Sequence, residues 1–403
     1  MGSSFRIGRA FGIEFRIDPS WLFIFTLVSW SLTSLFASWH PDWPLTTSVL
    51  VAVCTTLIFF ASVLFHELAH ATVARLNGIP VRHITLHLFG GVANIEKEPS
   101  SPAAEFWIAI VGPIASIGLG LAMIVLSSIL IGLHTADVDS AATAVSRLGP
   151  VSTALVWLGP VNIIVGLFNL LPGFPLDGGR ILRSIVWKVT GSLHEATRIA
   201  SASGQLLGWA FVVTGIVMAL GYQVPFFGRG LTSGLWLAMI GLFLRNAAVL
   251  HLRGAALDEA LAGVHAADLM RTQGLVVPAD LGVRELVEGW FMRHDDPAYP
   301  VMDHGTFVGI VSVDDVRKLR AADRSWDALR VRDVMTPREK IVAAHPDEEI
   351  SALLRKLADL DVRQLPVLDR GVLVGVLFER DVARWLELRP AIGRGPMAPH
   401  LRH

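Results

Sequence analysis

The residues best placed to do chemistry are two histidines and a glutamate in the motif H-E-L-A-H at residues 66–70. On a helix, His66 and His70 lie four residues apart on one face, so both imidazoles can bind one Zn²⁺. Glu67 then projects beside the metal as a base for a water molecule, a pattern typical of zinc metalloproteases. The alternative is a helix with two unrelated histidines. The location favours the metal site, because His and Glu are costly within an apolar segment and mark function there by default.

The composition indicates a membrane protein with a soluble part. Of the 403 residues, 52% are hydrophobic and 17% are charged, and the mean hydropathy is +0.53. Charged residues are sparse up to about residue 250 and dense afterwards, which predicts a membrane domain over residues 1–255. The net charge of −1 argues against a nucleic-acid partner. The single cysteine, Cys54, excludes an intrachain disulfide and leaves His, Asp and Glu as metal ligands.

Six apolar segments are long enough to cross a bilayer as helices. They cover residues 21–38, 48–75, 106–133, 153–171, 203–220 and 231–250. The first is expected to be a retained span, because residues 1–16 lack a secretory signal and no convincing cleavage site follows. The distribution of Lys and Arg between the segments places both termini in the cytoplasm of a multi-pass cell-membrane protein. His70 and Asp177 then lie at the cytoplasmic ends of their segments, where they can meet.

A small membrane-associated β-sheet is expected beside these helices. Residues 1–19 predict an amphipathic strand or a juxtamembrane hairpin, and residues 81–95 alternate in a strand period until Gly90 and Gly91 break the run. An unpaired strand edge beside the metal site would let an extended substrate add as a further strand. The alternative is an ordinary hairpin that packs on the helix bundle.

The stretch P-G-F-P-L-D-G-G-R at residues 172–180 interrupts the chain after the fourth apolar segment, which is itself expected to be broken at Gly159-Pro160. Its prolines and glycines stop a regular helix, so Asp177 is expected on irregular backbone at or near membrane depth. Such backbone is tolerated only where it is buried in protein or lines a wet cavity. A carboxylate held there needs a partner, and a bound Zn²⁺ meets that need. A basic amphipathic helix is expected to begin at Arg180.

The C-terminal part is a tandem repeat. The sequence V-H-A-A-D-L-M at 264–270 recurs as L-R-V-R-D-V-M at 329–335, and G-I-V-S-V-D-D at 309–315 recurs as G-V-L-F-E-R-D at 375–381. Each copy is predicted to fold as helix, strand, turn, strand and helix. The predicted domains cover residues 264–322 and 329–388, and the polar tail at 389–403 is predicted to be disordered.

The motif at 66–70, the Gly112-Pro113 segment and the stretch N-L-L-P-G-F-P-L-D-G-G at 169–179 together resemble the site-2 protease family of intramembrane zinc metalloproteases. The two repeats resemble cystathionine-β-synthase (CBS) domains, which one branch of that family carries at its C-terminus. The resemblance covers nearly the whole chain. The expected fold is an α-helical polytopic membrane domain of about six helices with a small β-sheet, followed by a soluble α/β tandem CBS domain.

The resemblance implies one Zn²⁺ per chain, held by His66, His70 and Asp177, with the fourth position open for water. It implies that Glu67 is the general base and acid. Asn169 would orient the substrate backbone or help to stabilise the oxyanion, or it would only cap the broken helix. Family members cleave transmembrane helices after local unwinding, so the expected partners are single-span membrane proteins and a regulatory membrane protein that gates access. The expected substrate-binding residues are Gly90, Gly91, Asn169 and Pro172.

The resemblance to CBS pairs implies a sensor that binds an adenine nucleotide such as ATP between the two repeats. In such pairs an Asp contacts the ribose, and a Ser or Thr lies nearby. The first copy has Ser312 and Asp315, whereas the second has Asp381 but Phe378 in place of the hydroxyl. Asp315 and Asp381 could equally be helix N-terminal residues that bind no ligand. Because CBS pairs often associate face to face, a homodimer through these domains is a further expectation.

The leading hypothesis is a membrane-embedded protease that cuts membrane-anchored regulators under the control of its CBS pair. The first alternative is a CBS-regulated transporter or channel. The matching broken helices that such transporters carry in two halves are not evident, since only residues 159–179 are strongly broken. The second alternative is a scaffold without catalysis, which the intact His, Glu and Asp residues disfavour.

Overall fold

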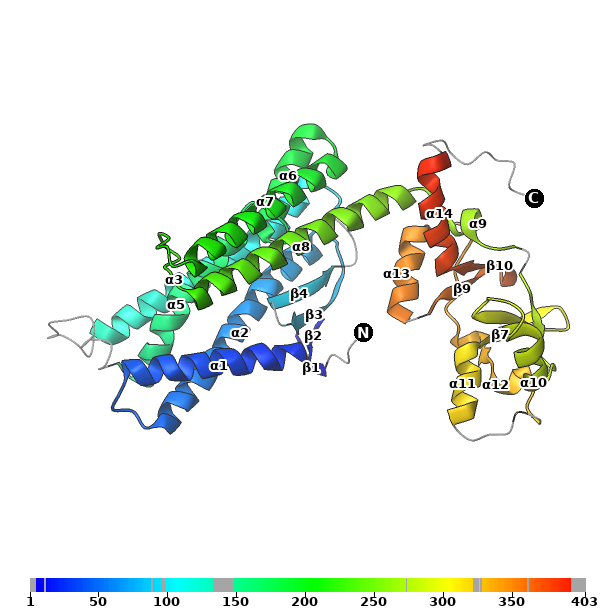
Figure 1. The fold of residues 1–403 in the computed structure, drawn as a ribbon, viewed down its shortest axis with the longest axis horizontal. Coiled ribbons are helices and arrows are strands. Elements are labelled where there is room, and N and C mark those ends of the chain that lie inside the picture. The colour runs from blue at the N-terminus through cyan, green and yellow to red at the C-terminus, as the bar shows by residue number, and fades with distance from the viewer. Residues whose placement is uncertain are drawn as a thin grey trace. The chain divides into compact units, whose positions relative to one another are not determined.

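The structure, a computed structural model, describes residues 5–10, 12–87, 90–95, 99–132, 148–272, 274–321, 326, 328–360 and 362–392. Contacts within the chain divide it into two units, Met1–Ala255 and Ala256–His403 (Figure 1). Each unit has its own hydrophobic clusters.

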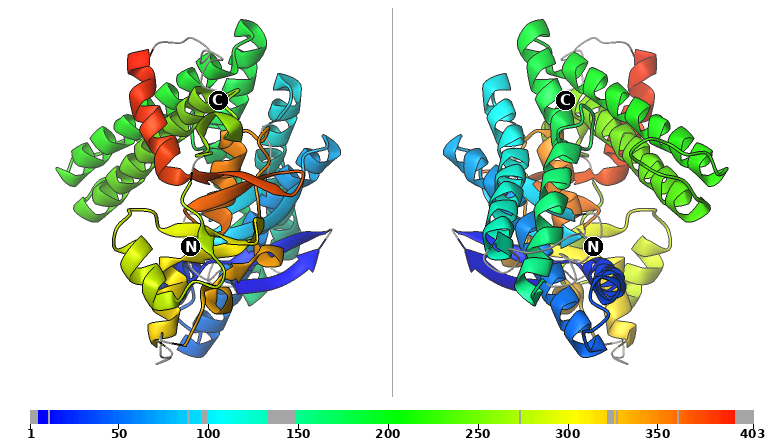
Figure 2. Two further views of the ribbon diagram at one scale, coloured as in Figure 1. Left: turned by 90° about the vertical axis from the view of Figure 1, so that its right-hand side faces the viewer. Right: turned by 90° about the vertical axis from the view of Figure 1, so that its left-hand side faces the viewer.

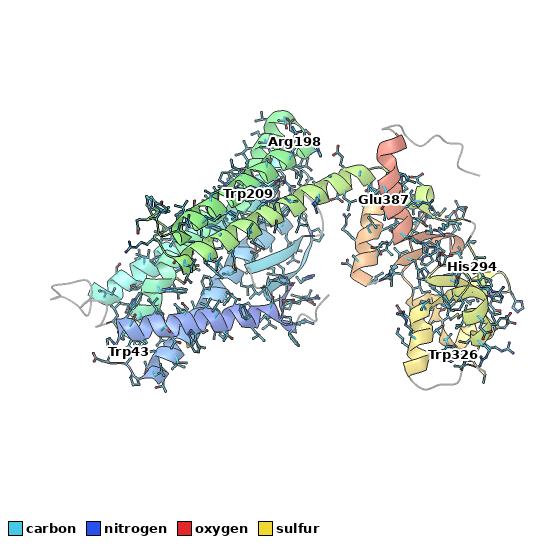
Figure 3. The ribbon with its side chains drawn as sticks, in the orientation of Figure 1. Trp43, Arg198, Trp209, His294, Trp326 and Glu387 are labelled. Carbon is cyan, nitrogen blue, oxygen red and sulfur yellow. The ribbon has the colours of Figure 1, made fainter. Side chains whose placement is uncertain are left out.

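The first unit is built from long apolar helices, as predicted. Within the described residues, six helices are long and apolar enough to cross a membrane: α1 (Ser20–Trp39), α2 (Leu45–Leu76), α3 (Pro102–Gly132), α5 (Pro150–Asn169), α7 (Leu193–Ala219) and α8 (Leu231–Leu261). A shorter helix, α6 (Asp177–Thr190), is amphipathic and corresponds to the predicted basic helix. Trp209 (Figure 3) marks the tight pairing of α7 with α8, since the Arg245 guanidinium lies 5.2 Å from its ring.

Helix α5 differs from the prediction of an interrupted segment. It runs unbroken from Pro150 to Asn169 with Pro160 inside it. Proline is tolerated in membrane helices because neighbouring helices and local adjustments satisfy the freed carbonyl. Gly159 lies so close to α3 that a Cβ there would stand 2.7 Å from the Ile124 side chain. The glycine therefore allows close helix packing where a break was expected.

A four-stranded sheet accompanies the helices, as expected. Its strands are β1 (Phe5–Ala10), β2 (Ile13–Ile17), β3 (Val81–His87) and β4 (Gly90–Ile95), in the spatial order β1-β2-β3-β4. Antiparallel pairing joins β1 to β2 and β3 to β4, and the middle pair is parallel. Buried apolar side chains of β2 and β3 pack on α2, among them Ile13 and Ile84 with Ala71. Figure 2 shows the first strands of the sheet as dark blue arrows. Strand β4 forms one edge of this sheet, beside α2.

The second unit contains the two predicted repeats. The first repeat is formed by α9 (Ala266–Leu269), β5 (Val277–Pro278), α10 (Val283–Leu286), η1 (Val287–Phe291), β6 (Ala298–Asp303), β7 (Thr306–Ser312) and α11 (Val313–Ala321). The second is formed by α12 (Val331–Val334), β8 (Thr336–Pro337), η2 (Arg338–Lys340), α13 (Ile350–Leu360), β9 (Gln364–Asp369), β10 (Val372–Phe378) and α14 (Glu379–Ile392). Because α14 continues to Ile392, the prediction of a disordered tail from Arg389 was wrong for its first four residues, 389–392; the rest lies outside the described residues.

The two repeats exchange their first segments. Arg271, at the start of the first repeat, pairs with Val376 on β10 of the second. In return β8 pairs with β7, where Thr336 opposes Ile310. The cores follow the same exchange, since Ala266 packs with second-repeat residues and Val331 packs with first-repeat residues. Trp326 (Figure 3) covers the first-repeat core. Neither repeat has a complete core without the other.

Candidate metal centre

Helix α2 carries both histidines of the H-E-L-A-H motif on one buried face. His66 and His70 are 5% and 3% exposed. Their Nε2 atoms lie 3.1 Å apart, as expected for residues spaced by four on a helix. The helix continues past the motif to Leu76, so both imidazoles are held by regular backbone near the end of the apolar run.

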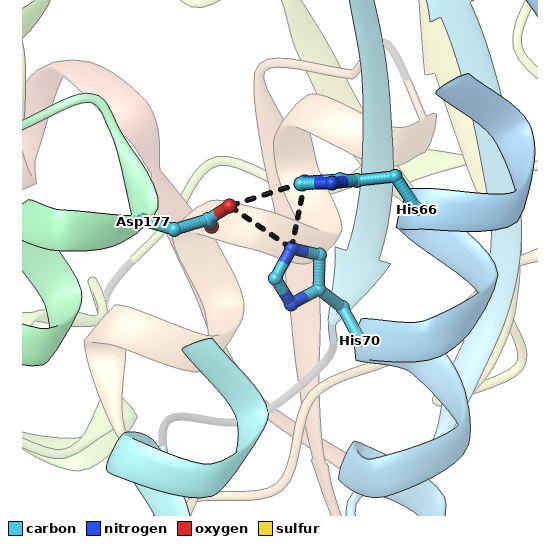
Figure 4. A group of neighbouring side chains, drawn as sticks. All are labelled: His66, His70 and Asp177. Atoms are coloured by element: carbon cyan, nitrogen blue, oxygen red, sulfur yellow. Dashed lines mark hydrogen bonds and ion pairs between the residues drawn. The ribbon is translucent and has the colours of Figure 1, made fainter. Parts of the chain in front are cut away.

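Asp177 comes from the irregular stretch that follows α5 and is the first residue of α6. Its Oδ2 lies 3.1 Å from Nε2 of His66 and 3.1 Å from Nε2 of His70 (Figure 4). The two following glycines make this approach sterically possible. A Cβ on Gly178 would stand 2.3 Å from the Leu170 carbonyl oxygen, and one on Gly179 would stand 2.4 Å from the Gly173 carbonyl carbon.

The three side chains fit the donor set of a zinc site. Two ligands at about 2.05 Å from a tetrahedral zinc lie roughly 3.3 Å apart, and all three pairs of ligand atoms here are separated by 3.1 Å. Two imidazole nitrogens and one carboxylate oxygen are ordinary zinc ligands. Three protein ligands leave one tetrahedral position for water, as in catalytic zinc sites.

Helix α3 orients both imidazoles, which the sequence analysis did not anticipate. Nδ1 of His66 lies 2.9 Å from the Ser116 hydroxyl, and Nδ1 of His70 lies 2.5 Å from the Ile108 carbonyl oxygen, to which it donates. A hydrogen bond at one ring nitrogen turns the other toward the metal. Gly112 lies between these two partners, and a Cβ there would stand 2.2 Å from Nε2 of His70. The only signal in the sequence was a glycine and a serine four residues apart in an apolar run.

Glu67 lies against the edge strand of the small sheet. A Cβ on Gly91 would stand 2.4 Å from Cγ of Glu67, so the two residues are in direct contact. Gly91 opposes Leu86 on β3, and Gly90 opposes His87. The edge strand β4 and the predicted general base are thus adjacent.

The other predicted substrate-binding residues lie near the segment that leads to Asp177. Asn169 is the half-buried last residue of α5, and Pro172 is exposed three residues later. The Pro172 carbonyl accepts a hydrogen bond from the Ser203 hydroxyl on α7. Their assignment to substrate stays a prediction.

The predicted nucleotide-binding residues of the CBS pair bond to protein groups. Ser312 and Asp315 cap helix α11: the Ser312 hydroxyl and amide donate to Asp315 Oδ2 over 2.7 and 2.9 Å, and the Asp315 amide donates to the hydroxyl. Asp381 accepts two hydrogen bonds from Arg271, at 2.7 and 2.6 Å. These bonds raise the pKa of the Arg271 guanidinium above its usual value.

The chain belongs to peptidase family M50, the family of site-2 zinc metalloproteases, and carries two CBS domains. The M50 model matches residues 54–212, and the CBS model matches residues 266–322 and 331–388. The matched M50 region contains the histidine pair and Asp177. The enzyme is therefore a zinc metalloprotease with a multi-pass membrane unit.

Several relatives match along nearly their whole length. The chain is 33% identical to the zinc metalloprotease Rip3 of Mycobacterium tuberculosis over 96% of this chain and 94% of that one. It is 31% identical to the zinc metalloprotease sll0528 of Synechocystis over 97% of each chain. Among solved structures, the site-2 protease from Methanocaldococcus jannaschii is similar with a TM-score of 0.40 and 25% identity, covering 62% of this chain and 96% of that one.

Proposed function

We propose that this metalloprotease cleaves transmembrane segments of membrane-anchored regulatory proteins, with one zinc ion held by His66, His70 and Asp177. The observation that carries the proposal is the convergence of three ligand atoms, each 3.1 Å from the other two, while both Nδ1 atoms bond elsewhere. Because this centre lies on helices of membrane-spanning length, its substrate must reach it from within or beside the bilayer.

The chemistry is peptide hydrolysis. Zinc held by these three residues would supply a water ligand with a pKa of about 7 and a Lewis acid for the scissile carbonyl. Glu67 takes the proton from the attacking water and returns it to the leaving amine. Asn169, at the end of α5, orients the substrate backbone or donates to the developing oxyanion.

The substrate is proposed to bind as an added strand on β4. An edge strand presents unpaired amide and carbonyl groups, which an extended peptide can pair with. Gly90 and Gly91 place no side chain in the way, and Gly91 touches Glu67. A peptide paired here would bring its backbone next to the base. A transmembrane helix would have to unwind locally first, since a helix has no free backbone groups to pair.

We further propose that the CBS pair binds an adenine nucleotide and tunes cleavage, and that both termini are cytoplasmic. Ser312 and Asp315 are the preferred nucleotide contacts, because a ligand at Asp381 would have to displace its two bonds from Arg271. A homodimer through the CBS domains and a gating partner in the membrane are part of the same proposal.

The test is cleavage of a single-span substrate in liposomes by wild type and Glu67→Gln, with and without ATP, with zinc measured in parallel. We expect about one zinc per chain in both proteins and at least a roughly thousandfold loss of cleavage in the variant. Glu288→Gln, a change of the same type at an exposed position of the second unit, is the matched control and should cleave normally. An active Glu67→Gln would remove the role given to Glu67, and a wild type without zinc would remove the mechanism.

A further inference from the structure

One buried face of α3 contacts both elements that supply the proposed zinc ligands. Ile108, Gly112 and Ser116, spaced by four, touch the two imidazoles of α2. One turn before Ile108, the same buried face carries Glu105, which is fully inaccessible to solvent. Residues at these spacings lie along a single helix face. Glu105 contacts α6, the helix that begins with Asp177.

The contact is an ion pair with Arg183. One oxygen of Glu105, Oε1, lies 2.6 Å from Nε and 2.5 Å from Nη2 of Arg183. The side chain of Arg183 is 10% exposed and that of Glu105 is 0% exposed, so the pair is removed from water. Arg183 lies six residues after Asp177 on α6. The pair therefore fixes α6 against the helix that orients both histidines.

Arg183 also reaches the other side of Asp177 in the sequence. Its guanidinium lies 5.4 Å from the ring centroid of Phe174, three residues before Asp177. The same ring stacks on His251 of α8 at 4.7 Å and an interplanar angle of 14°. The backbone of Phe174 packs on α7, because a Cβ on Gly204 would stand 2.1 Å from the Phe174 carbonyl oxygen. Arg183, which follows Asp177 in the sequence, thus contacts the chain that precedes it.

A buried ion pair of this kind needs a reason other than stability. The desolvation of two charges offsets most of their attraction, and apolar residues of similar volume at such sites are often as stable or more stable. Two nitrogens of one rigid guanidinium that contact the same carboxylate oxygen do, however, define one register between two helices. In this unit the register decides where the first residue of α6 lies relative to the imidazoles.

We propose that Glu105 and Arg183 are positioning residues that set α6 so that Asp177 Oδ2 reaches both Nε2 atoms. They touch neither substrate nor metal and act through Asp177. The inference rests on the zinc site proposed above and names the buried pair that assembles it. Helix α3 then positions all three proposed ligands. Glu105 positions Asp177 by way of Arg183, and Ile108 and Ser116 orient the two histidines.

The test separates positioning from stability with the double variant E105L/R183M, which replaces the pair by apolar side chains in the full-length protein. We expect R183M alone to lower both the thermal stability and the affinity for Zn²⁺, measured by competition with a chromophoric chelator. The double variant should regain stability yet bind Zn²⁺ about 10- to 100-fold more weakly than wild type. Its Co²⁺ derivative should show an altered visible absorption spectrum. R245M, which removes a guanidinium that lies over Trp209 on α7, is the matched control and should bind metal as wild type does.

A double variant with wild-type metal affinity and Co²⁺ spectrum would overturn the positioning role while leaving the zinc site intact. A wild type that binds no metal would instead remove the proposed function itself. If the double variant fails to fold, metal binding by R183K tests the positioning role instead, because lysine keeps the charge but lacks the planar guanidinium. Weaker metal binding by folded R183K supports the proposal, and unchanged binding contradicts it.

Discussion

Two partly buried aspartates, one in each unit, have opposite surroundings. The side chain of Asp177 is 14% exposed and that of Asp381 is 17% exposed. Asp381 is paired with Arg271 through two hydrogen bonds, so its charge is balanced within the protein. Asp177 faces two imidazoles whose Nε2 atoms also face each other. In the site proposed here the charge of Asp177 is balanced by zinc, because imidazoles are neutral when they ligate a metal, whereas Arg271 balances the charge of Asp381.

The difference shows how a carboxylate in a helix-initiating position is used in each unit. In the membrane unit, α3 orients the imidazoles toward a common point, where Asp177 meets them. In the CBS unit, the carboxylates cap a helix or bind an arginine of the other repeat. A metal ion at Asp177 would bind without displacing a charged protein group. A ligand at the CBS carboxylates would have to compete with the protein groups already bonded to them.

Removal of one proposed ligand should have the largest effect. Asp177→Ala leaves two imidazoles without the oxygen that completes the set, so we expect zinc content to fall far below one per chain. Cleavage should fall by at least about a thousandfold, because three ligands are needed to hold a catalytic zinc. Metal analysis and a cleavage assay measure both. Asp381→Ala, the matched change in the CBS unit, should leave both unchanged. A wild-type zinc content in Asp177→Ala would take Asp177 out of the ligand set.

A methyl group between the imidazoles and α3 should disturb the site next most strongly. Gly112→Ala would place Cβ 2.2 Å from Nε2 of His70, so α3 or the ring must move. We expect zinc affinity to fall by about 10- to 100-fold, measured by chelator competition. Gly118→Ala on the same helix meets open space within 4 Å and should bind zinc normally. Equal affinities for the two variants would show that Gly112 does not shape the site.

Loss of one orienting hydrogen bond should be milder. Ser116→Ala removes the hydroxyl 2.9 Å from Nδ1 of His66 while leaving the ligand in place. We expect zinc affinity to fall by about tenfold, the smaller end of the range for loss of a hydrogen-bond partner of a metal ligand. Ser128→Ala, which loses only a bond to the Ile124 carbonyl of its own helix, is the control. If both variants bind zinc alike, the hydroxyl does not hold the ring.

The local motifs predicted the long helices and the proximity of the proposed zinc ligands, because each of these features depends on a short stretch of sequence. The helix period places His66 and His70 together, and the apolar lengths define six helices that are all present. The partners of these ligands were not predictable, since they depend on how α3 crosses α2 and α6. Glu105 is an example, because it was placed outside the predicted helix. The apolar run was expected to begin at residue 106, whereas α3 begins at Pro102 and includes the glutamate on its buried face.

The CBS unit shows the same limit. The repeat and its acidic residues are evident in the sequence. Arg271, the partner of Asp381, lies 110 residues away in the other repeat. It reaches Asp381 only because the repeats exchange their first segments, an arrangement that no local pattern encodes.

A change in the Arg271–Asp381 pair should lower the stability of the second unit without changing catalysis. Arg271→Lys keeps the charge but loses the fork that donates to both carboxylate oxygens. Because the Arg271 side chain is 40% exposed, we expect the second unit to lose only about 1 kcal/mol of unfolding free energy. Denaturant unfolding followed by the tryptophans of that unit measures this. Arg317→Lys, in an exposed pair with Asp314, should be neutral. An unchanged midpoint in Arg271→Lys would indicate that Asp381 is not bound through the fork.

The helix cap at Ser312 should give the smallest effect. Ser312→Ala removes the hydroxyl that accepts from the Asp315 amide and donates to the Asp315 carboxylate. Loss of a cap costs about 1 kcal/mol, so amide exchange in the first turn of α11 should rise by about fivefold in full-length protein. Zinc content and cleavage without nucleotide should not change, because this residue belongs to the other unit. Thr306→Ala, at the other end of β7, is the control. If exchange stays unchanged while a dependence of cleavage on ATP is lost, Ser312 is held for the nucleotide and the capping role is minor.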